Sequence, residues 1–259
     1  YIMKNTFLFS ILIIAMVGLA SCKKKKTNTT NANSTTNSTE TAADITVYLK
    51  NVIDSKTINF GVLEFANKAG NTYSVSELKY YISEISFTKD DGKIVSSTQV
   101  SLIDAADTKM QSFNIKQLPN GTYTKMKFYI GVGSLQNHSG LQEGALDPMN
   151  GMFWTWNTGY IFFKHDGQFI DSTGATKGVS FHLGTDVAYA KIEIPVNFSI
   201  IGKAKNVYLK FDLNKLYETP NLINFDFGNN HQSTSVNDSA WIAKMKQNFN
   251  HSFSFDYAE

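Results

Sequence analysis

The stretch AKIEIPVNFSI, residues 190–200, places an apolar side chain at every second position. Successive side chains of a β-strand point to opposite faces, so a period of two predicts a strand with one buried face and one solvated face. Residues 207–213 repeat this pattern a few positions later. We interpret both stretches as half-buried antiparallel strands.

The same kind of pattern recurs along the rest of the chain, between short groups of turn-forming residues. Further strands are predicted at residues 46–50, 81–89, 125–132, 160–164 and 179–183. Turns between strands are indicated by Asp90-Asp91-Gly92, Pro119-Asn120-Gly121 and Asp166-Gly167. With only 4 prolines and no alternation of strands with helices, the pattern predicts an all-β fold, an antiparallel β-sandwich, and not a parallel sheet.

One helix interrupts this pattern near the C-terminus. Within residues 238–249, apolar residues fall on one helical face and lysines on the other. We expect Trp241, on the apolar face, to anchor this short helix on a sheet. Residues 135–150 show neither period and are predicted to form a long loop.

Residues 1–43 have the composition of an export signal followed by a tether. An uncharged apolar run at residues 7–20 leads to Leu19-Ala20-Ser21-Cys22, which holds the only cysteine. A run of this length is too short to cross a bilayer core of ~30 Å comfortably. We expect residues 1–21 to be a lipoprotein signal peptide, 22–43 a disordered polar tether with lipidated Cys22 at its start, and 44–259 the folded domain.

Charge and cysteine content exclude several classes of function. Five lysines and one glutamate precede Asp44, which leaves 19 lysines and 21 acidic residues in 44–259, a net charge of −2. The chain has no arginine, which argues against nucleic-acid binding. If Cys22 carries lipid, no thiol remains for a nucleophile or a cysteine-based zinc site. No nucleophile elbow, phosphate-binding loop or His-Glu-x-x-His motif occurs, so we expect no enzyme activity.

Two tryptophans mark the most distinctive segment, GMFWTWNTGYIFFKHDG, residues 151–167. Trp154 and Trp156 are one residue apart, and Met152 precedes them. Large aromatics commonly fill sandwich cores, so one interpretation of this segment is structural. The other is chemical, because an indole pair beside a thioether and histidines is able to take part in metal binding.

The amino-acid pattern of this segment resembles that of the MbnP-like family, the methanobactin-associated periplasmic copper proteins and related Bacteroidetes lipoproteins. The family pattern Met-x-Trp-x-Trp-x-x-Gly-Tyr matches residues 152–160. LKYYIS at 78–83, FYIGVG at 128–133 and FHLG at 181–184 resemble further family elements in the same order. The resemblance extends over residues 45–257.

The resemblance implies a non-catalytic copper-binding protein. In the best-understood relatives, a tryptophan is oxidised to kynurenine by a di-haem partner of the MauG type, and the modified residue helps to bind copper beside histidines. Carried over to this chain, the implied copper ligands are His182 and His231, and the implied oxidised or metal-adjacent residues are Trp154, Trp156 and Met152. Imidazole suits copper, and a thioether favours Cu(I).

The other three histidines are weaker ligand candidates. His138 lies in the predicted loop and is expected at the solvated surface. His251 ends the predicted helix, where a positive charge interacts favourably with the negative end of the helix dipole. His165 precedes the predicted Asp166-Gly167 turn, at a position where relatives more often carry an apolar or acidic residue.

A second interpretation is a metal-free interaction module, anchored to the bilayer through Cys22, that works with an outer-membrane receptor or the di-haem partner. It predicts an exposed aromatic patch around Phe153, Tyr160 and Phe162. Convergence of His182 and His231 on one tryptophan would favour copper instead. In either case, we expect the chain in the bacterial cell envelope, anchored at the outer membrane and facing the periplasm.

Overall fold

The computed structural model describes residues 41–154, 159–227, 230–232 and 239–259. The expected signal peptide, Cys22 and most of the tether lie outside these residues. Contacts group residues 39–259 into one unit, and strand β1 begins at Ala42, two residues before the expected start of the domain. Among the described residues, no helix is long and apolar enough to cross a membrane.

The smaller of two sheets is built around the first strand. β1 pairs with β13 in parallel and with β8 and β2 in the antiparallel sense, and β15 pairs with β13. The prediction of a strand over 207–213 is therefore confirmed, while its antiparallel orientation holds only toward β15. The strands of this sheet are β1 (Ala42–Ile53), β2 (Lys56–Thr57), β8 (Ser112–Pro119), β13 (Lys205–Asp212) and β15 (Phe253–Ala258).

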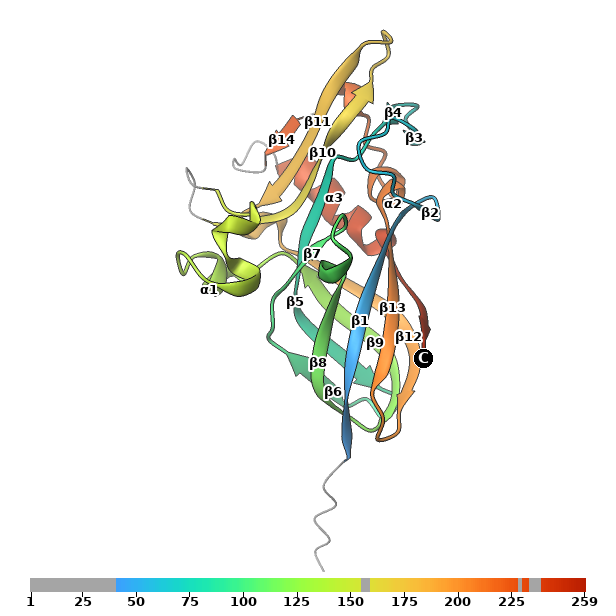
Figure 1. The fold of residues 1–259 in the computed structure, drawn as a ribbon, viewed down its shortest axis with the longest axis vertical. Helices are drawn as coiled ribbons and strands as arrows, with labels where there is room; N and C mark the ends of the chain where they lie inside the picture. Colours follow the sequence, from blue (N-terminus) through green and yellow to red (C-terminus); the bar gives the residue numbers. More distant parts are fainter. Residues whose placement is uncertain (1–40, 155–158, 228–229, 233–238) are drawn as a thin grey trace, which may run out of the picture. The chain divides into compact units, whose positions relative to one another are not determined.

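The larger sheet has the order β12-β9-β5-β10-β11-β14, with four short strands attached at its margins. Its main neighbours are antiparallel, except that β14 runs parallel to β11. Figure 1 shows β10 and β11 as a long hairpin. The strands are β3 (Phe65–Ala66), β4 (Thr72–Tyr73), β5 (Glu77–Lys89), β6 (Ile94–Ser97), β7 (Ser101–Asp104), β9 (Gly121–Ile130), β10 (Ile161–Ile170), β11 (Thr176–Gly184), β12 (Ala190–Ile200) and β14 (Asn230–Gln232).

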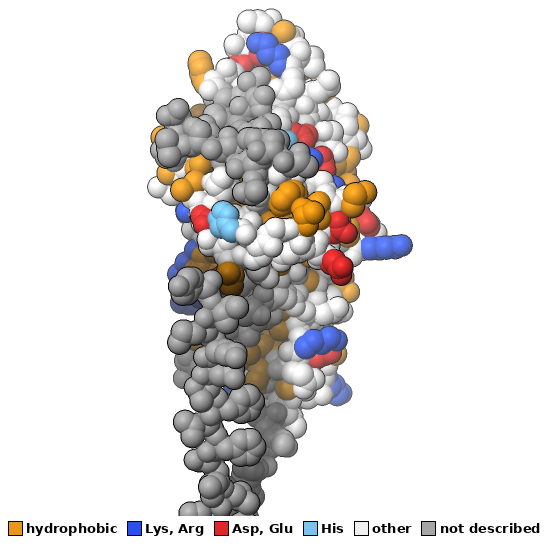
Figure 2. Space-filling model, turned by 90° about the vertical axis from the view of Figure 1, so that its left-hand side faces the viewer, with side chains coloured by type: hydrophobic (Ala, Val, Ile, Leu, Met, Phe, Trp, Pro, Cys, Tyr) orange, Lys and Arg blue, Asp and Glu red, His pale blue; other side chains and the backbone are white. Residues whose placement is uncertain are grey.

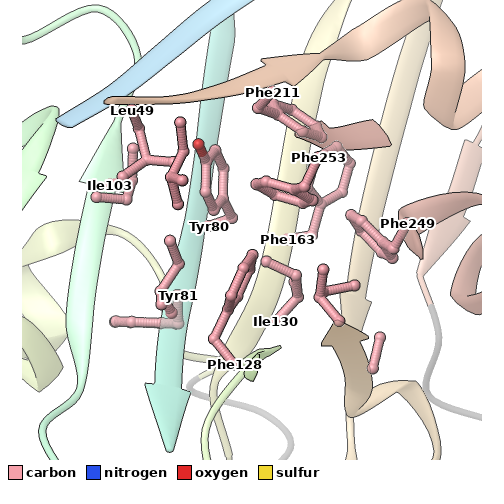
Figure 3. Close-up of a cluster of buried hydrophobic side chains, with 14 of the residues drawn as sticks. Leu49, Tyr80, Tyr81, Ile103, Phe128, Ile130, Phe163, Phe211, Phe249 and Phe253 are labelled. Carbon is pink, nitrogen blue, oxygen red and sulfur yellow. The ribbon is translucent and has the colours of Figure 1, made fainter. Parts of the chain in front are cut away.

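The two sheets face each other across an aromatic core, which confirms the all-β sandwich. In Figure 3, Phe128 and Phe163 of the larger sheet lie opposite Phe211 and Phe253 of the smaller one. Tyr80 bridges the layers, with its ring 5.1 Å from that of Phe211. Burial of these rings is the main apolar contribution to the stability of the domain.

Helices cover the part of the larger sheet that carries β10 and β11. Residues of α3 contact both strands, since Phe249 packs 5.4 Å from Phe163 and Trp241 packs 5.4 Å from Phe181. The predicted C-terminal helix and its core anchor Trp241 are thus confirmed. The helices are α1 (Ser134–Asn137), α2 (Leu213–Glu218) and α3 (Ser239–Ser252), and the 3₁₀ turns are η1 (Thr108–Met110), η2 (Gly144–Leu146), η3 (Pro148–Asn150), η4 (Asp186–Ala188) and η5 (Phe225–Phe227).

One predicted turn is wrong. Asp166 and Gly167 lie inside β10, and the chain turns only after Ile170. Glycine is required at this strand position because a Cβ on residue 167 would lie 2.0 Å from the carbonyl oxygen of Ser74. A glycine inside a strand here marks close approach of another backbone, not a reversal.

Candidate functional site

Backbone hydrogen bonds join the described residues on either side of the tryptophan segment. Phe153 and Tyr160 form an isolated bridge, and the amide of Trp154 donates to the carbonyl of Gly159 at 3.1 Å. Met152 is fully buried, and its carbonyl accepts from Ile161. Residues 155–158, including Trp156, lie outside the described residues, so the structure places one of the two predicted tryptophans.

Trp154 packs against the end of β11. Its side chain is 5% exposed. A Cβ at Gly184 would lie 2.4 Å from Cζ3 of Trp154, so the indole occupies the space where a side chain would stand. Gly184 and His182 are two positions apart on β11 and therefore face the same side of the sheet. The indole therefore packs at the end of β11, on the same face of the strand as His182.

His182 is held on that face by a carboxylate on the neighbouring strand. Its Nε2 lies 2.9 Å from Oδ1 of Asp166 and 3.2 Å from the hydroxyl of Ser180. Ser180 also donates to Asp166 at 2.6 Å. Burial alone would raise the pKa of Asp166, but the hydrogen bonds from His182 and Ser180 lower it to about 2. The carboxylate is therefore charged at neutral pH, and Nε2 donates to it.

This arrangement fixes which nitrogen of His182 is suited to a metal. A carboxylate only accepts, so Nε2 carries the hydrogen and Nδ1 carries the lone pair of the neutral ring. Among the described residues, the hydrogen bonds of this imidazole run through Nε2. A metal-binding histidine commonly donates its other N–H to a carboxylate in this way, which orients the ring and raises its basicity.

His182 stands at the end of a row of charged side chains, which we call the charged row. The pairs are Lys79 with Asp104 at 3.4 Å and with Glu77 at 2.9 Å, then Lys164 with Glu77 at 2.7 Å. Lys164 continues to Asp166 at 3.8 Å. The charged row consists of Asp104, Lys79, Glu77, Lys164, Asp166 and His182. These side chains are between 14% and 29% exposed, so water screens their interactions only in part.

The second predicted ligand, His231, lies on the strand next to His182. β14 pairs with β11 in parallel, with His231 opposite Phe181 and Gln232 opposite His182. The side chain of His231 is outside the described residues. Neighbouring strands are ~4.8 Å apart, so the backbones of the two predicted ligands lie close together. The register nevertheless places position 231 beside Phe181, on the face of the sheet opposite to that of His182.

The remaining histidines differ in their surroundings. His138 follows α1, is exposed and pairs with Asp186 at 3.2 Å, as predicted for a surface residue. His251 lies in the last turn of α3, also as predicted. His165 is not beside a turn: it is fully buried in β10, with Nδ1 2.5 Å from the hydroxyl of Tyr217. Burial lowers the pKa of His165 to about 4, so this ring is neutral at pH 7.

One further prediction for this region, an exposed aromatic patch, can be compared with the burial of its side chains. Tyr160 and Phe162 are fully buried and Phe153 is half-buried, so the predicted exposed aromatic patch around them is wrong. On the face in Figure 2, hydrophobic side chains lie in small groups between polar ones. The residues that the structure describes contain no cluster of three or more His, Cys, Asp or Glu side chains able to hold a metal.

Sequence reasoning missed Asp166 as the partner of His182. The signal was present in the turn residues Asp171-Ser172-Thr173-Gly174, which lie between the two strands. A hairpin centred there pairs Asp166 with Ser180 and Lys164 with His182. Choosing that turn in place of Asp166-Gly167 would have predicted the cluster.

Of three comparisons with known proteins, two return a match. A protein-family model described as MbnP matches residues 24–238. Among solved structures, the chain is similar to MbnP from Methylosinus trichosporium, with 16% identity over 70% of this chain and 79% of that chain and a TM-score of 0.47. A search of curated proteins finds no match.

Proposed function

The chain belongs to the MbnP family, and from this premise we propose that it is a non-catalytic, copper-binding lipoprotein of the bacterial cell envelope. His182 and His231 are the proposed ligands. The observation that carries the proposal is the imidazole of His182, which Asp166 orients. Trp154 packs on the same face of the strand, at its end.

The local chemistry supports copper at Nδ1 of His182. The side chain of His182 is 14% exposed, and its Nε2 is committed to a carboxylate. His231 enters the proposal from the family resemblance alone. Bound copper would supply a soft cation that imidazole and thioether ligands prefer. Met149 is 90% exposed, and Met152 is fully buried beside Trp154 in the sequence.

Asp166 has a positioning role in this proposal. Its carboxylate keeps the hydrogen of His182 on Nε2 and keeps the ring in one orientation. Loss of a carboxylate that orients a metal-binding histidine commonly lowers metal affinity 10–100-fold.

The experiment is an anaerobic Cu(I) titration of the purified protein and five variants. We expect weaker binding in His182→Ala and His231→Ala, and a smaller loss in Asp166→Asn. His138→Ala is the matched control, because it removes another histidine that pairs with an aspartate, at Asp186. Wild-type affinity in a His182→Ala and His231→Ala double variant would contradict the proposed ligands.

We further propose that one of Trp154 and Trp156 is oxidised to kynurenine by a di-haem oxidase of the MauG type. Kynurenine adds a carbonyl and an arylamine where indole offers only a donor. The test is mass spectrometry of the peptide spanning residues 151–164, taken from copper-loaded protein of the native host. Two unmodified tryptophans would exclude a required kynurenine and leave the histidine ligands as the proposal.

The proposed location follows from the export signal and tether expected in residues 1–43. We propose that Cys22 carries the lipid and that the domain faces the periplasm from the outer membrane. Labelled palmitate is expected in the wild-type protein and absent from Cys22→Ala. Equal labelling of both would contradict the anchor without affecting the copper proposal.

A further inference from the structure

A second chemically distinctive pair lies on the opposite face of β10 from the proposed copper site. His165 of β10 and Tyr217 of α2 are fully buried, and their ring centroids are 5.7 Å apart. Nδ1 of His165 is 2.5 Å from the phenol oxygen of Tyr217. The proposed copper site uses neither side chain.

The surrounding backbone sets the direction of this hydrogen bond. Nε2 of His165 is 3.3 Å from the carbonyl oxygen of Ser74, an atom that only accepts. The ring nitrogen facing Ser74 therefore carries the hydrogen, and Nδ1 carries the lone pair. Tyr217 consequently donates its phenol hydrogen to His165.

The pair lies in a buried aromatic cluster with carboxylates around it. The rings of Tyr73, Phe181 and Phe225 all lie within 6.2 Å of the Tyr217 ring, centroid to centroid. Negative charge at Asp166 acts on both His165 and Tyr217, and Asp54, Asp212 and Glu218 act on the neighbouring Tyr73. His182 opposes this effect at His165. A negative surrounding field favours loss of an electron and stabilises an imidazolium.

Ring contacts connect the pair to the surface of the domain. Phe181 lies 5.5 Å from Tyr217 and 5.4 Å from Trp241 of α3, again between ring centroids. Trp241 is half-buried, so part of its surface reaches solvent. An oxidant at the protein surface therefore has an aromatic route of two short steps to Tyr217.

We propose that Tyr217 is a redox-active tyrosine and that His165 is its proton acceptor. A strong outer-sphere one-electron oxidant takes one electron from Tyr217 by way of Trp241 and is itself reduced by one electron. The O–H bond of Tyr217 breaks as its proton forms a bond with Nδ1 of His165. The products are a neutral tyrosyl radical and an imidazolium, and one-electron reduction reverses the step.

This assignment rests on the different acidities of the two forms of the phenol. An intact buried phenol keeps its proton, and burial raises the pKa of Tyr217 well above 10. A phenol that has lost an electron is a far stronger acid than imidazolium, so the proton then moves to His165 despite the burial of that ring. The assignment goes beyond copper binding and does not depend on it.

The test is photo-oxidation of the metal-free purified protein with flash-generated tris(bipyridine)ruthenium(III), followed by freeze-quench electron paramagnetic resonance. We expect a tyrosyl signal that Tyr217→Phe removes. His165→Asn keeps an acceptor near the position of Nδ1 but cannot take up the proton, so it should also lose the signal. Tyr257→Phe, at an exposed tyrosine, is the matched control and should keep it.

Two results would overturn the assignment. One is a wild-type signal that persists in folded Tyr217→Phe, which would place the radical on another tyrosine. The other is a wild-type radical without coupling to an exchangeable hydrogen-bonded proton when spectra in H₂O and D₂O are compared. The second measurement needs no variant, so the proposal stays testable even if His165→Asn fails to fold.

Discussion

The inner and outer faces of the β10–β11 hairpin use the same residue type in opposite ways. On the inner face, His165 is sealed among aromatic rings, is neutral and bonds to a phenol. On the outer face, His182 is half-buried and pairs with a charged carboxylate. The two histidines lie on neighbouring strands, so their difference comes from strand alternation and from what covers each face. Local sequence around a histidine therefore says less about its chemistry than the face to which it belongs.

The largest expected difference between the faces is in packing. Phe181→Ala removes a ring that contacts Tyr217, Phe225 and Trp241, and large-to-small changes at such sites cost ~3–5 kcal/mol of unfolding free energy. Ser180→Ala, one residue away on the outer face, loses a hydrogen bond to the charged carboxylate of Asp166, which is worth about 1.5–3 kcal/mol. Urea unfolding followed by circular dichroism measures both. Equal losses would remove the distinction between the faces.

Acid is the next way to separate the faces. Because the pKa of His165 is about 4 in the folded state and about 6.5 when unfolded, the unfolded chain binds more protons between these values. The stability from the neutral ring is present above pH 6.5 and is lost as the pH falls to 4, by about 3 kcal/mol. We expect His165→Phe to lack this decline.

On the outer face, the same argument gives a lower pH window. The pKa of Asp166 is about 2, below its ordinary value of 3.8, so its stabilising effect is present above pH 3.8 and is lost as the pH falls through 2. Urea midpoints between pH 7.5 and 2.5 should show Asp166→Asn departing from wild type mainly in its slope below pH 4. A difference in slope between Asp166→Asn and wild type near pH 6 would contradict the separation of the two windows.

Two glycines on the outer face of β11 offer a smaller, matched comparison. A Cβ at Gly184 would meet the Trp154 ring at 2.4 Å and the Tyr160 carbonyl oxygen at 2.6 Å, and such overpacking costs ~1–3 kcal/mol. A Cβ at Gly178 would have no atom within 4 Å. We expect Gly184→Ala to lower the melting temperature and shift tryptophan fluorescence, and Gly178→Ala to do neither. The reverse order would mean that Trp154 does not pack on Gly184.

The smallest expected effect is in the charged row. Glu77 and Lys164 are 2.7 Å apart and partly exposed, so a double-mutant cycle with Glu77→Gln and Lys164→Met should give a coupling of ~0.2–1 kcal/mol. This coupling should decrease with added salt. A coupling of several kcal/mol, insensitive to salt, would show that the outer face behaves like a buried core.

Strands were predictable where the signal was local. The alternation in β12 appears in the structure as buried and exposed residues in turn, and the apolar face of the C-terminal helix packs where expected. The parallel pairing of β1 with β13 was not predictable, because paired residues such as Ile45 and Lys205 are separated in sequence by most of the domain. No local period carries that information, since it depends on which strand edges meet.

The candidate site was predictable in its components but not in its assembly. The predicted strand over residues 179–183 is present, with Phe181 and Leu183 buried in the core and the side chain of His182 between them 14% exposed. Asp166 was assigned to a turn because an Asp-Gly pair usually marks one. The approach of the Ser74 backbone, which requires Gly167 in the strand, comes from a segment distant in sequence.

The position of β1 also has a consequence for how the chain acquires its fold. β1 is the first long strand of the domain, yet it is completed on one side by β8 and on the other by β13, which itself pairs with the C-terminal β15. A chain emerging from its N-terminus therefore carries β1 with one edge unpaired until nearly the whole polypeptide is available. Pairings this distant close slowly, and an open strand edge invites association with other chains. During synthesis, the first strand of this domain therefore keeps an edge open to association with other chains until β13 is available.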